Sequence, residues 1–85
     1  MRRTEFTYGQ LDRTLRSLGF SCRLVKSEPQ ARLYEHAASG ATVHYPPFPD
    51  GDKVLEYHLV GVRHTLDEFG IADPKTFTSE LQKAA

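Results

Sequence analysis

The chain has 85 residues, enough for one compact domain and too few for two, which excludes multi-domain cofactor enzymes. Hydrophobic residues make up 39% and charged residues 26%, a composition typical of a folded globular domain. Eleven Lys and Arg balance eleven Asp and Glu, which excludes a uniformly basic nucleic-acid coat. The balance is uneven along the chain, because residues 1–33 hold seven basic residues against three acidic ones, and residues 34–85 hold four against eight.

A single cysteine, Cys22, excludes an internal disulfide framework and fits a reducing compartment, so we predict a cytoplasmic protein. In an alternating apolar row, this cysteine is expected to pack as a small hydrophobe. Met1-Arg2-Arg3 is followed by no apolar run, so neither a signal peptide nor a membrane-spanning helix is expected. The histidine spacing fits no common zinc motif and no nucleotide-binding glycine loop is present, so we predict no metal and no cofactor.

The first expected element is a helix that begins after Thr7, which forms a capping box with Gln10. Apolar residues then recur at helical spacing as far as about Leu18. Gly19 stands where the residue after a helix adopts a positive φ, so the chain is expected to turn there. The sequence therefore predicts one amphipathic helix near the N-terminal end.

Three short segments follow with the alternating pattern of half-buried strands: residues 20–25, 31–36 and 41–45. Short turns join them, so they are expected to form an antiparallel meander. One sheet face is expected to be covered by helices and to carry Phe20, Cys22, Leu24, Leu33, Val43 and Tyr45. The open face is expected to carry Arg23, Arg32, Tyr34, His36, Thr42 and His44.

The rest of the chain predicts a loop and two helices. Prolines 46, 47 and 49 forbid regular structure and are expected to make a stiff connection. A helical stripe follows, formed by Leu55, Leu59, Val62, Leu66 and Phe69. Gly70 ends that helix, and Asp73 with Pro74 predicts the start of a third helix that buries Phe77 and Leu81. The predicted fold is an α-β-β-β-α-α two-layer sandwich of the α+β class, a single domain over residues 1–85 with its helices on one sheet face.

The open sheet face carries the candidate functional residues. Arg23, Lys26 and Arg32, with the ring of Tyr34, are a candidate surface for RNA, because cations contact phosphates and an aromatic ring stacks on bases. His36 and His44 are predicted on adjacent strands of this face, where two imidazoles can serve as acid and base on a phosphodiester. His58 and His64 flank the stripe of the second helix and are expected at the surface or its boundary.

Residues 8–81 resemble the HicA family of small mRNA-interferase toxins, whose fold is similar to that of double-stranded-RNA-binding domains. The likeness rests on four short segments: Leu18-Gly19-Phe20, Leu33-Tyr34-Glu35-His36, Val43-His44-Tyr45-Pro46 and Phe69-Gly70-Ile71. In that family a Gly-Ser-His motif opens the second strand and supplies the catalytic histidine. Here the corresponding stretch reads Pro29-Gln30-Ala31, and the Pro-x-His that often follows the third strand is replaced by Pro46-Pro47-Phe48. The resemblance therefore implies the fold and a link to RNA or to an antitoxin-like partner, and it assigns no catalytic residue.

Three hypotheses follow from the sequence. The first is a HicA-like domain that lacks the family's mRNA cleavage and binds RNA or an antitoxin-like protein through the open sheet face. The second is an active, metal-independent ribonuclease that uses His36 and His44. The third is a small interaction module whose sheet edge or proline loop recruits a protein partner or a second copy to form a homodimer.

Overall fold

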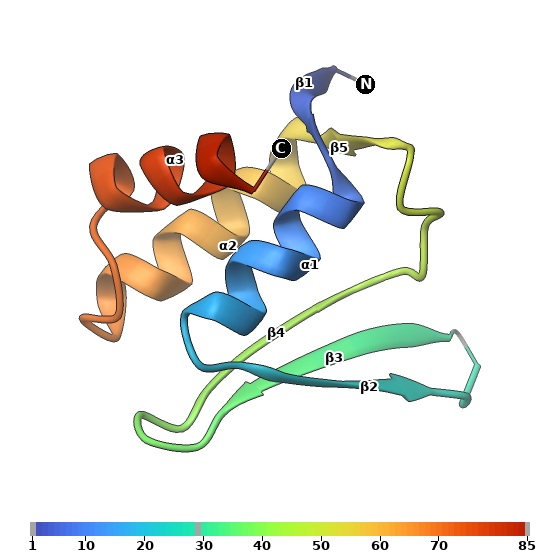
Figure 1. The fold of residues 1–85 in the computed structure, drawn as a ribbon. Coiled ribbons are helices and arrows are strands. Elements are labelled where there is room, and N and C mark those ends of the chain that lie inside the picture. The colour runs from blue at the N-terminus through green and yellow to red at the C-terminus, as the bar shows by residue number, and fades with distance from the viewer. Residues whose placement is uncertain (1, 29, 85) are drawn as a thin grey trace.

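The computed structural model describes residues 2–28 and 30–84, and within them the chain forms five strands and three helices (Figure 1). The strands are β1 (Arg3–Thr7), β2 (Ser21–Val25), β3 (Ala31–His36), β4 (Ala41–Tyr45) and β5 (Lys53–Leu55). The helices are α1 (Tyr8–Ser17), α2 (Glu56–Glu68) and α3 (Pro74–Lys83). β2, β3 and β4 form an antiparallel sheet in that order, and β1 pairs antiparallel with β5 in a separate two-stranded sheet. The predicted α+β class is confirmed.

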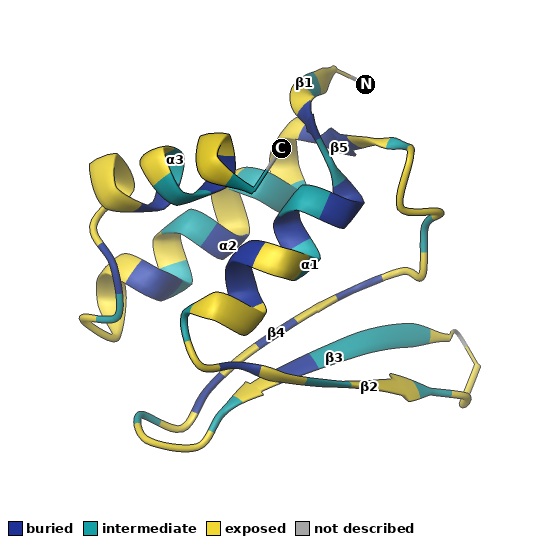
Figure 2. Ribbon diagram, viewed as in Figure 1, coloured by how far each residue is buried: buried dark blue, intermediate teal, exposed yellow. Residues whose placement is uncertain are grey.

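The helices lie on one side of the three-stranded sheet. α1 contacts β2 and α2 contacts β4, while α3 packs against α1 and α2 (Figure 1). The opposite face of the sheet carries no helix, and its residues are mostly exposed (Figure 2). The core between helices and sheet includes the most deeply buried large side chains, which are Tyr8, Leu11, Leu15, Tyr34, Leu66, Phe77 and Leu81. No helix in the described ranges combines the length and the hydropathy that crossing a bilayer requires.

Local signals in the sequence set the helix boundaries. The Thr7 hydroxyl accepts a hydrogen bond from the Gln10 backbone N–H, and the Gln10 side chain accepts one from the Thr7 N–H, so the predicted capping box is confirmed. Gly19 and Gly70 have φ of 98° and 69°, as expected for residues that turn the chain after a helix. Asp73 caps α3, with Pro74 at its first turn.

Two elements escaped the sequence analysis, namely the strands β1 and β5. β1 has only one buried side chain, Phe6, and β5 has three residues, so neither shows a readable alternation. Leu55, predicted as the first member of the α2 stripe, is instead the last residue of β5 and the N-cap of α2. Phe69 was also wrongly placed in that stripe. It is the C-cap residue of α2, beyond the last full turn, and remains 46% exposed.

The strand register corrects the predicted faces of β3. Tyr34 pairs with Cys22 on one side and with Val43 on the other, and residues directly opposite each other share a face. Tyr34, with Arg32 and His36 on the same side of β3, therefore lies on the covered face, whereas Leu33 lies on the open one. The prediction took the only aliphatic residue in the middle of β3 as its buried member. A shift of one position exchanged the two faces of the strand.

The other strands follow the predicted alternation. Phe20, Val43 and Tyr45 are buried, and Cys22 is half-buried against the core. Leu24 is opposite Arg32, beyond the main cover of the helices, and is 47% exposed, so its predicted burial was wrong.

Candidate functional site

The cations of the predicted RNA surface do not form one positive patch. Arg23 lies on the open face, and its Nε is 3.1 Å from the Oε1 of Glu35, two positions diagonally across the ladder. Lys26 lies in the exposed loop that follows β2. Arg32 lies on the opposite face from Arg23, because they occupy positions of opposite parity in the register. The structure thus separates the three cations that an RNA backbone would need together.

Arg32 and Tyr34 are engaged in a polar network under α1. The Arg32 Nη1 is 3.8 Å from the Oδ1 of Asp12 and 3.5 Å from the Oδ1 of Asp50. The Tyr34 hydroxyl donates to the Asp12 Oδ1 at 2.6 Å, and the Tyr45 hydroxyl donates to the Tyr34 oxygen at 2.9 Å. Because its side chain is fully buried, Tyr34 cannot stack on a base as predicted. This network supports the fold instead of presenting groups to a ligand.

The two histidines of the ribonuclease hypothesis lie on opposite faces of the sheet. His36 is opposite Ala41 on the covered face, where its ring lies 5.0 Å from that of Phe20 and its Nδ1 is 2.8 Å from the Ser39 hydroxyl. His44 is opposite Leu33 on the open face and is exposed. Side chains on opposite faces of one sheet cannot act on the same phosphodiester, so this acid–base pair does not exist.

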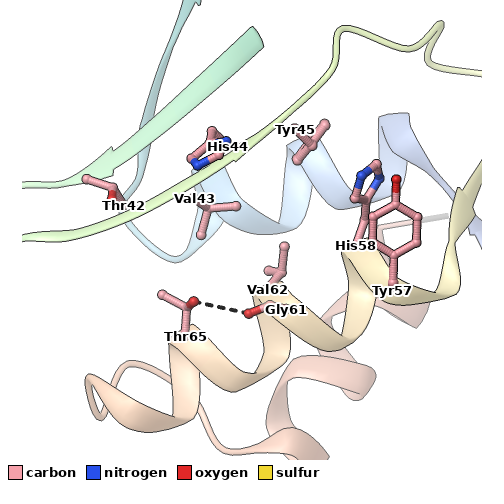
Figure 3. Close-up of a pocket in the computed structure, with 9 residues that line it drawn as sticks. All are labelled: Thr42, Val43, His44, Tyr45, Tyr57, His58, Gly61, Val62 and Thr65. Atoms are coloured by element: carbon pink, nitrogen blue, oxygen red, sulfur yellow. Dashed lines mark hydrogen bonds between the residues drawn. The ribbon is translucent and has the colours of Figure 1, made fainter.

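A groove lies between β4 and α2. Its volume is about 280 Å³. It is lined by Thr42, Val43, His44 and Tyr45 from β4, and by Tyr57, His58, Gly61, Val62 and Thr65 from α2 (Figure 3). The two walls come from segments about 15 residues apart in sequence, which the proline-containing loop and β5 bring together.

His58 is the most constrained of the polar residues in this groove. Its Nδ1 is 2.7 Å from the Tyr8 hydroxyl, which also accepts a hydrogen bond from the Leu55 backbone N–H at 3.2 Å. The hydroxyl proton of Tyr8 is thus available for Nδ1, an arrangement that places the ring proton on Nε2. Burial lowers the pKa of His58 below its usual value, which also favours the neutral ring. Rings of Tyr45, Phe48 and Tyr57 surround the imidazole at centroid distances of 4.2–6.0 Å.

The lining of the groove favours binding over catalysis. It is made of two histidines, two threonines, two tyrosines, two valines and a glycine, with no carboxylate, thiol or fixed cation. Nowhere in residues 2–28 and 30–84 do three His, Cys, Asp or Glu side chains gather in a way that could hold a metal ion. The arrangement can therefore accept and donate hydrogen bonds along an apolar trough.

Of the predicted site residues, only His44 reaches this groove. The groove residues on α2 were missed, because Tyr57, His58 and Thr65 each have the sequence pattern of ordinary surface positions beside the apolar stripe. One signal was available in the sequence. Gly61 interrupts an otherwise regular amphipathic helix, where glycine is unfavourable, and such a glycine often marks a close approach or an open space.

Comparison of the chain with protein-family models, curated proteins and solved structures finds no match.

Proposed function

We propose that the chain is a HicA-like binding domain that recognises an antitoxin-like protein partner and lacks the family's histidine-dependent mRNA cleavage. The observation that carries this proposal is that the arginines of the three-stranded sheet are paired with carboxylates. Arg23 is matched by Glu35 and Arg32 by Asp12 and Asp50, and the two arginines lie on opposite faces. What the exposed surface offers is mixed and partly apolar, including Leu33 on the open face and Tyr57 and Val60 on α2.

The absence of cleavage is supported at the position that the resemblance identifies. Ala31 occupies it, opposite Val25 on the open face, and alanine has no group that can transfer a proton. The histidines that could have replaced the missing one are separated by the sheet, as described above. Of the two surfaces that the sequence suggested for a protein partner, the sheet edge is favoured over the proline loop, because Phe48 of that loop stacks on Tyr8 at 4.7 Å.

The test combines a partner arm with an RNA arm. The chain is co-expressed with the product of any small reading frame that adjoins its gene, and the purified proteins are run together by size-exclusion chromatography. A stable complex of the two is expected. The isolated chain is also titrated with single-stranded and structured RNA at low salt, where no saturable binding is expected.

Two results concerning RNA would overturn the proposal. One is RNA binding that weakens steeply with salt and is lost in the variant Arg23→Glu with Lys26→Glu, both exposed positions. The other is growth arrest on overexpression, accompanied by loss of messenger RNA, that a His44→Ala or His58→Ala substitution relieves. Failure to form a complex with the neighbouring product would remove the antitoxin-like partner.

A further inference from the structure

We infer that the groove between β4 and α2 takes up an extended peptide segment of the protein partner, which adds a fourth strand beside β4 and places an acidic side chain next to His58. This inference rests on the proposed function, since it assigns the partner a binding mode. It goes beyond that function by naming the surface, the conformation of the bound segment and its chemistry.

The way β4 lines the groove shows that the groove follows the edge of the strand. A cavity over one face of a strand meets every second residue, because side chains alternate between faces. This groove is lined by four consecutive residues, Thr42 to Tyr45. β4 is the last strand of its sheet, paired only with β3, and no backbone hydrogen bond within the described ranges joins its outer edge to another segment. An edge of this kind is a template for a further strand.

The opposite wall of the groove is α2, and it has a glycine, without a side chain, in its middle. Gly61 lies in the interior of α2, where glycine costs about 1 kcal/mol relative to alanine. A Cβ built on Gly61 would meet no atom within 4 Å, so the packing of this chain does not require glycine there. The Thr65 hydroxyl donates to the Gly61 carbonyl at 3.1 Å across one turn of the helix (Figure 3). The consequence of the glycine is open space facing β4, which a side chain of the incoming strand can fill.

The two walls match in length. Thr42 to Tyr45 covers three strand steps, roughly 10 Å at about 3.3 Å per residue. Tyr57 to Thr65 covers eight helical steps, roughly 12 Å at about 1.5 Å per residue. A segment of about four extended residues therefore fits between them. Short segments of this kind bind through their backbone, while side-chain pockets on alternate positions give specificity.

Hydrogen bonding and the absence of like charge favour an acidic segment. The nine lining residues include no carboxylate, and His58 stands on the α2 wall, whereas the His44 side chain lies on the open face of the sheet. With Nδ1 of His58 held by Tyr8, the nitrogen left for a ligand is Nε2, which carries a proton in the tautomer described above. Of the three carboxylates of α2, Glu56 pairs with Arg2 and Glu68 with His64, and none of the three, Asp67 included, lines the groove. A carboxylate on the bound strand thus finds donors in the groove and no like charge in its lining.

The test uses random hexapeptides displayed on phage and selected on the purified chain. The enriched sequences are synthesised and their affinities are measured by fluorescence polarisation. We expect alternating apolar side chains with an Asp or Glu. Methylation of backbone nitrogens at one parity should weaken binding by about tenfold or more, because alternate N–H groups of an added strand point to β4, and methylation at the other parity should change it little.

A variant pair tests the location. Gly61→Phe fills the groove and should lower the affinity by about tenfold or more. Gly51→Phe is the matched control, because a Cβ at Gly51 also meets nothing within 4 Å and its φ is not in the left-handed region. The control should bind like wild type. Circular dichroism and thermal unfolding confirm that both variants are folded.

Each other outcome counts against the inference. Enrichment of no peptide, equal tolerance of methylation at both parities, or equal binding by Gly61→Phe and Gly51→Phe would overturn it. Peptides enriched without any acidic residue would overturn the charge assignment. The failure is separable from that of the proposed function: if Gly61→Phe still forms the complex with the neighbouring product, only the groove is wrong, whereas a wild-type chain that forms no such complex contradicts the proposed function itself.

Discussion

Tyr34 joins three elements through its hydroxyl group. It donates to Asp12 of α1 and accepts from Tyr45 of β4, while its ring lies 5.5 Å from that of Tyr45. Burial, and next the hydrogen bond to the Asp12 carboxylate, raise the pKa of Tyr34 far above its usual value, and burial raises that of Tyr45. Both phenols therefore keep their protons throughout the physiological range and act as fixed donors in the core.

Replacing Tyr34 by Phe removes one hydroxyl group, and each of its two partners loses a hydrogen bond. The Asp12 Oδ1 loses its closest donor, and the Tyr45 hydroxyl loses its acceptor in a dry site. We expect Tyr34→Phe to lower the free energy of unfolding by about 2 kcal/mol, measured by urea denaturation, because a buried polar group without a partner costs about 1–3 kcal/mol. Tyr57→Phe, at a tyrosine that is 55% exposed, is the control and should change it little. Equal losses in the two variants would contradict the role of the network.

The same residue shows why the candidate site was only partly predictable. Arginine, tyrosine and histidine at alternate positions of β3 are typical of a solvent-facing strand. Only the groups that they contact place them on the covered face. Those partners, Asp12 and Asp50, are 20 residues before and 18 after Arg32 in the sequence, so no local pattern reveals them. The predicted faces of β4 were correct, because the apolar Val43 and the aromatic ring of Tyr45 are buried in simple alternation with exposed Thr42 and His44.

At the scale of helices and strands, the ends of helices were more predictable than the pairing of strands. The starts of α1 and α3 depend on residues within one turn, Thr7 with Gln10 and Asp73 with Pro74, so the sequence alone was sufficient there, whereas α2 has no side-chain cap and its end residues were predicted wrongly. The β1–β5 pair joins Arg3 to Leu55, which is a long-range contact between two short segments with little pattern of their own. The groove was equally hard to predict from the sequence, because β5 and the loop before it bring α2 beside β4.

The helix α2 provides a direct test of whether Gly61 is retained at a cost. Gly61→Ala should raise the free energy of unfolding by about 1 kcal/mol, since Ala is the better helix former and its Cβ meets no atom within 4 Å. Gly70→Ala also places its Cβ in open space, but Gly70 has a φ of 69°, so that variant should lose about 1 kcal/mol. Thermal and urea unfolding of the two variants measure the difference. A loss of stability in Gly61→Ala would show that glycine is needed for the fold and would remove its link to the groove.

Across the whole molecule, folding cancels the charge asymmetry of the sequence. Arg2, Arg23 and Arg32 come from the basic first part of the chain, and they pair with Glu56, Glu35 and Asp50 from the acidic remainder. The pairs of Arg2 and Arg23 are largely exposed and contribute little to stability on their own. They do place a carboxylate beside each of these two arginines, so neither presents an unmatched charge to a polyanion.

His58 connects this whole-molecule picture to pH, because its ring joins α1, β4, α2 and the proline-containing loop through Tyr8, Tyr45, Tyr57 and Phe48. Burial lowers the pKa of His58 in the folded chain below the unfolded value of about 6.5. The unfolded chain therefore binds the proton more readily. The contribution of neutral His58 is complete above about pH 6.5 and is lost as the pH falls through the window between the unfolded and the folded pKa. Protonation would also put an N–H where Tyr8 donates its own proton.

We therefore expect the melting temperature of the wild-type chain to fall more between about pH 7.5 and pH 5 than that of a His58→Gln variant, in which this titration is absent. His64→Gln is the matched control, because His64 is exposed and on the same helix, with Glu68 as its ion-pair partner at 3.3 Å. The other histidines are common to wild type and His58→Gln, so their contributions cancel in that comparison. A wild-type decrease that His58→Gln reproduces in full would show that the aromatic cluster holds a protonated His58 as well as a neutral one. The proton at Nε2, which the acidic segment needs as a donor, would then be present on the charged ring as well as on the neutral one.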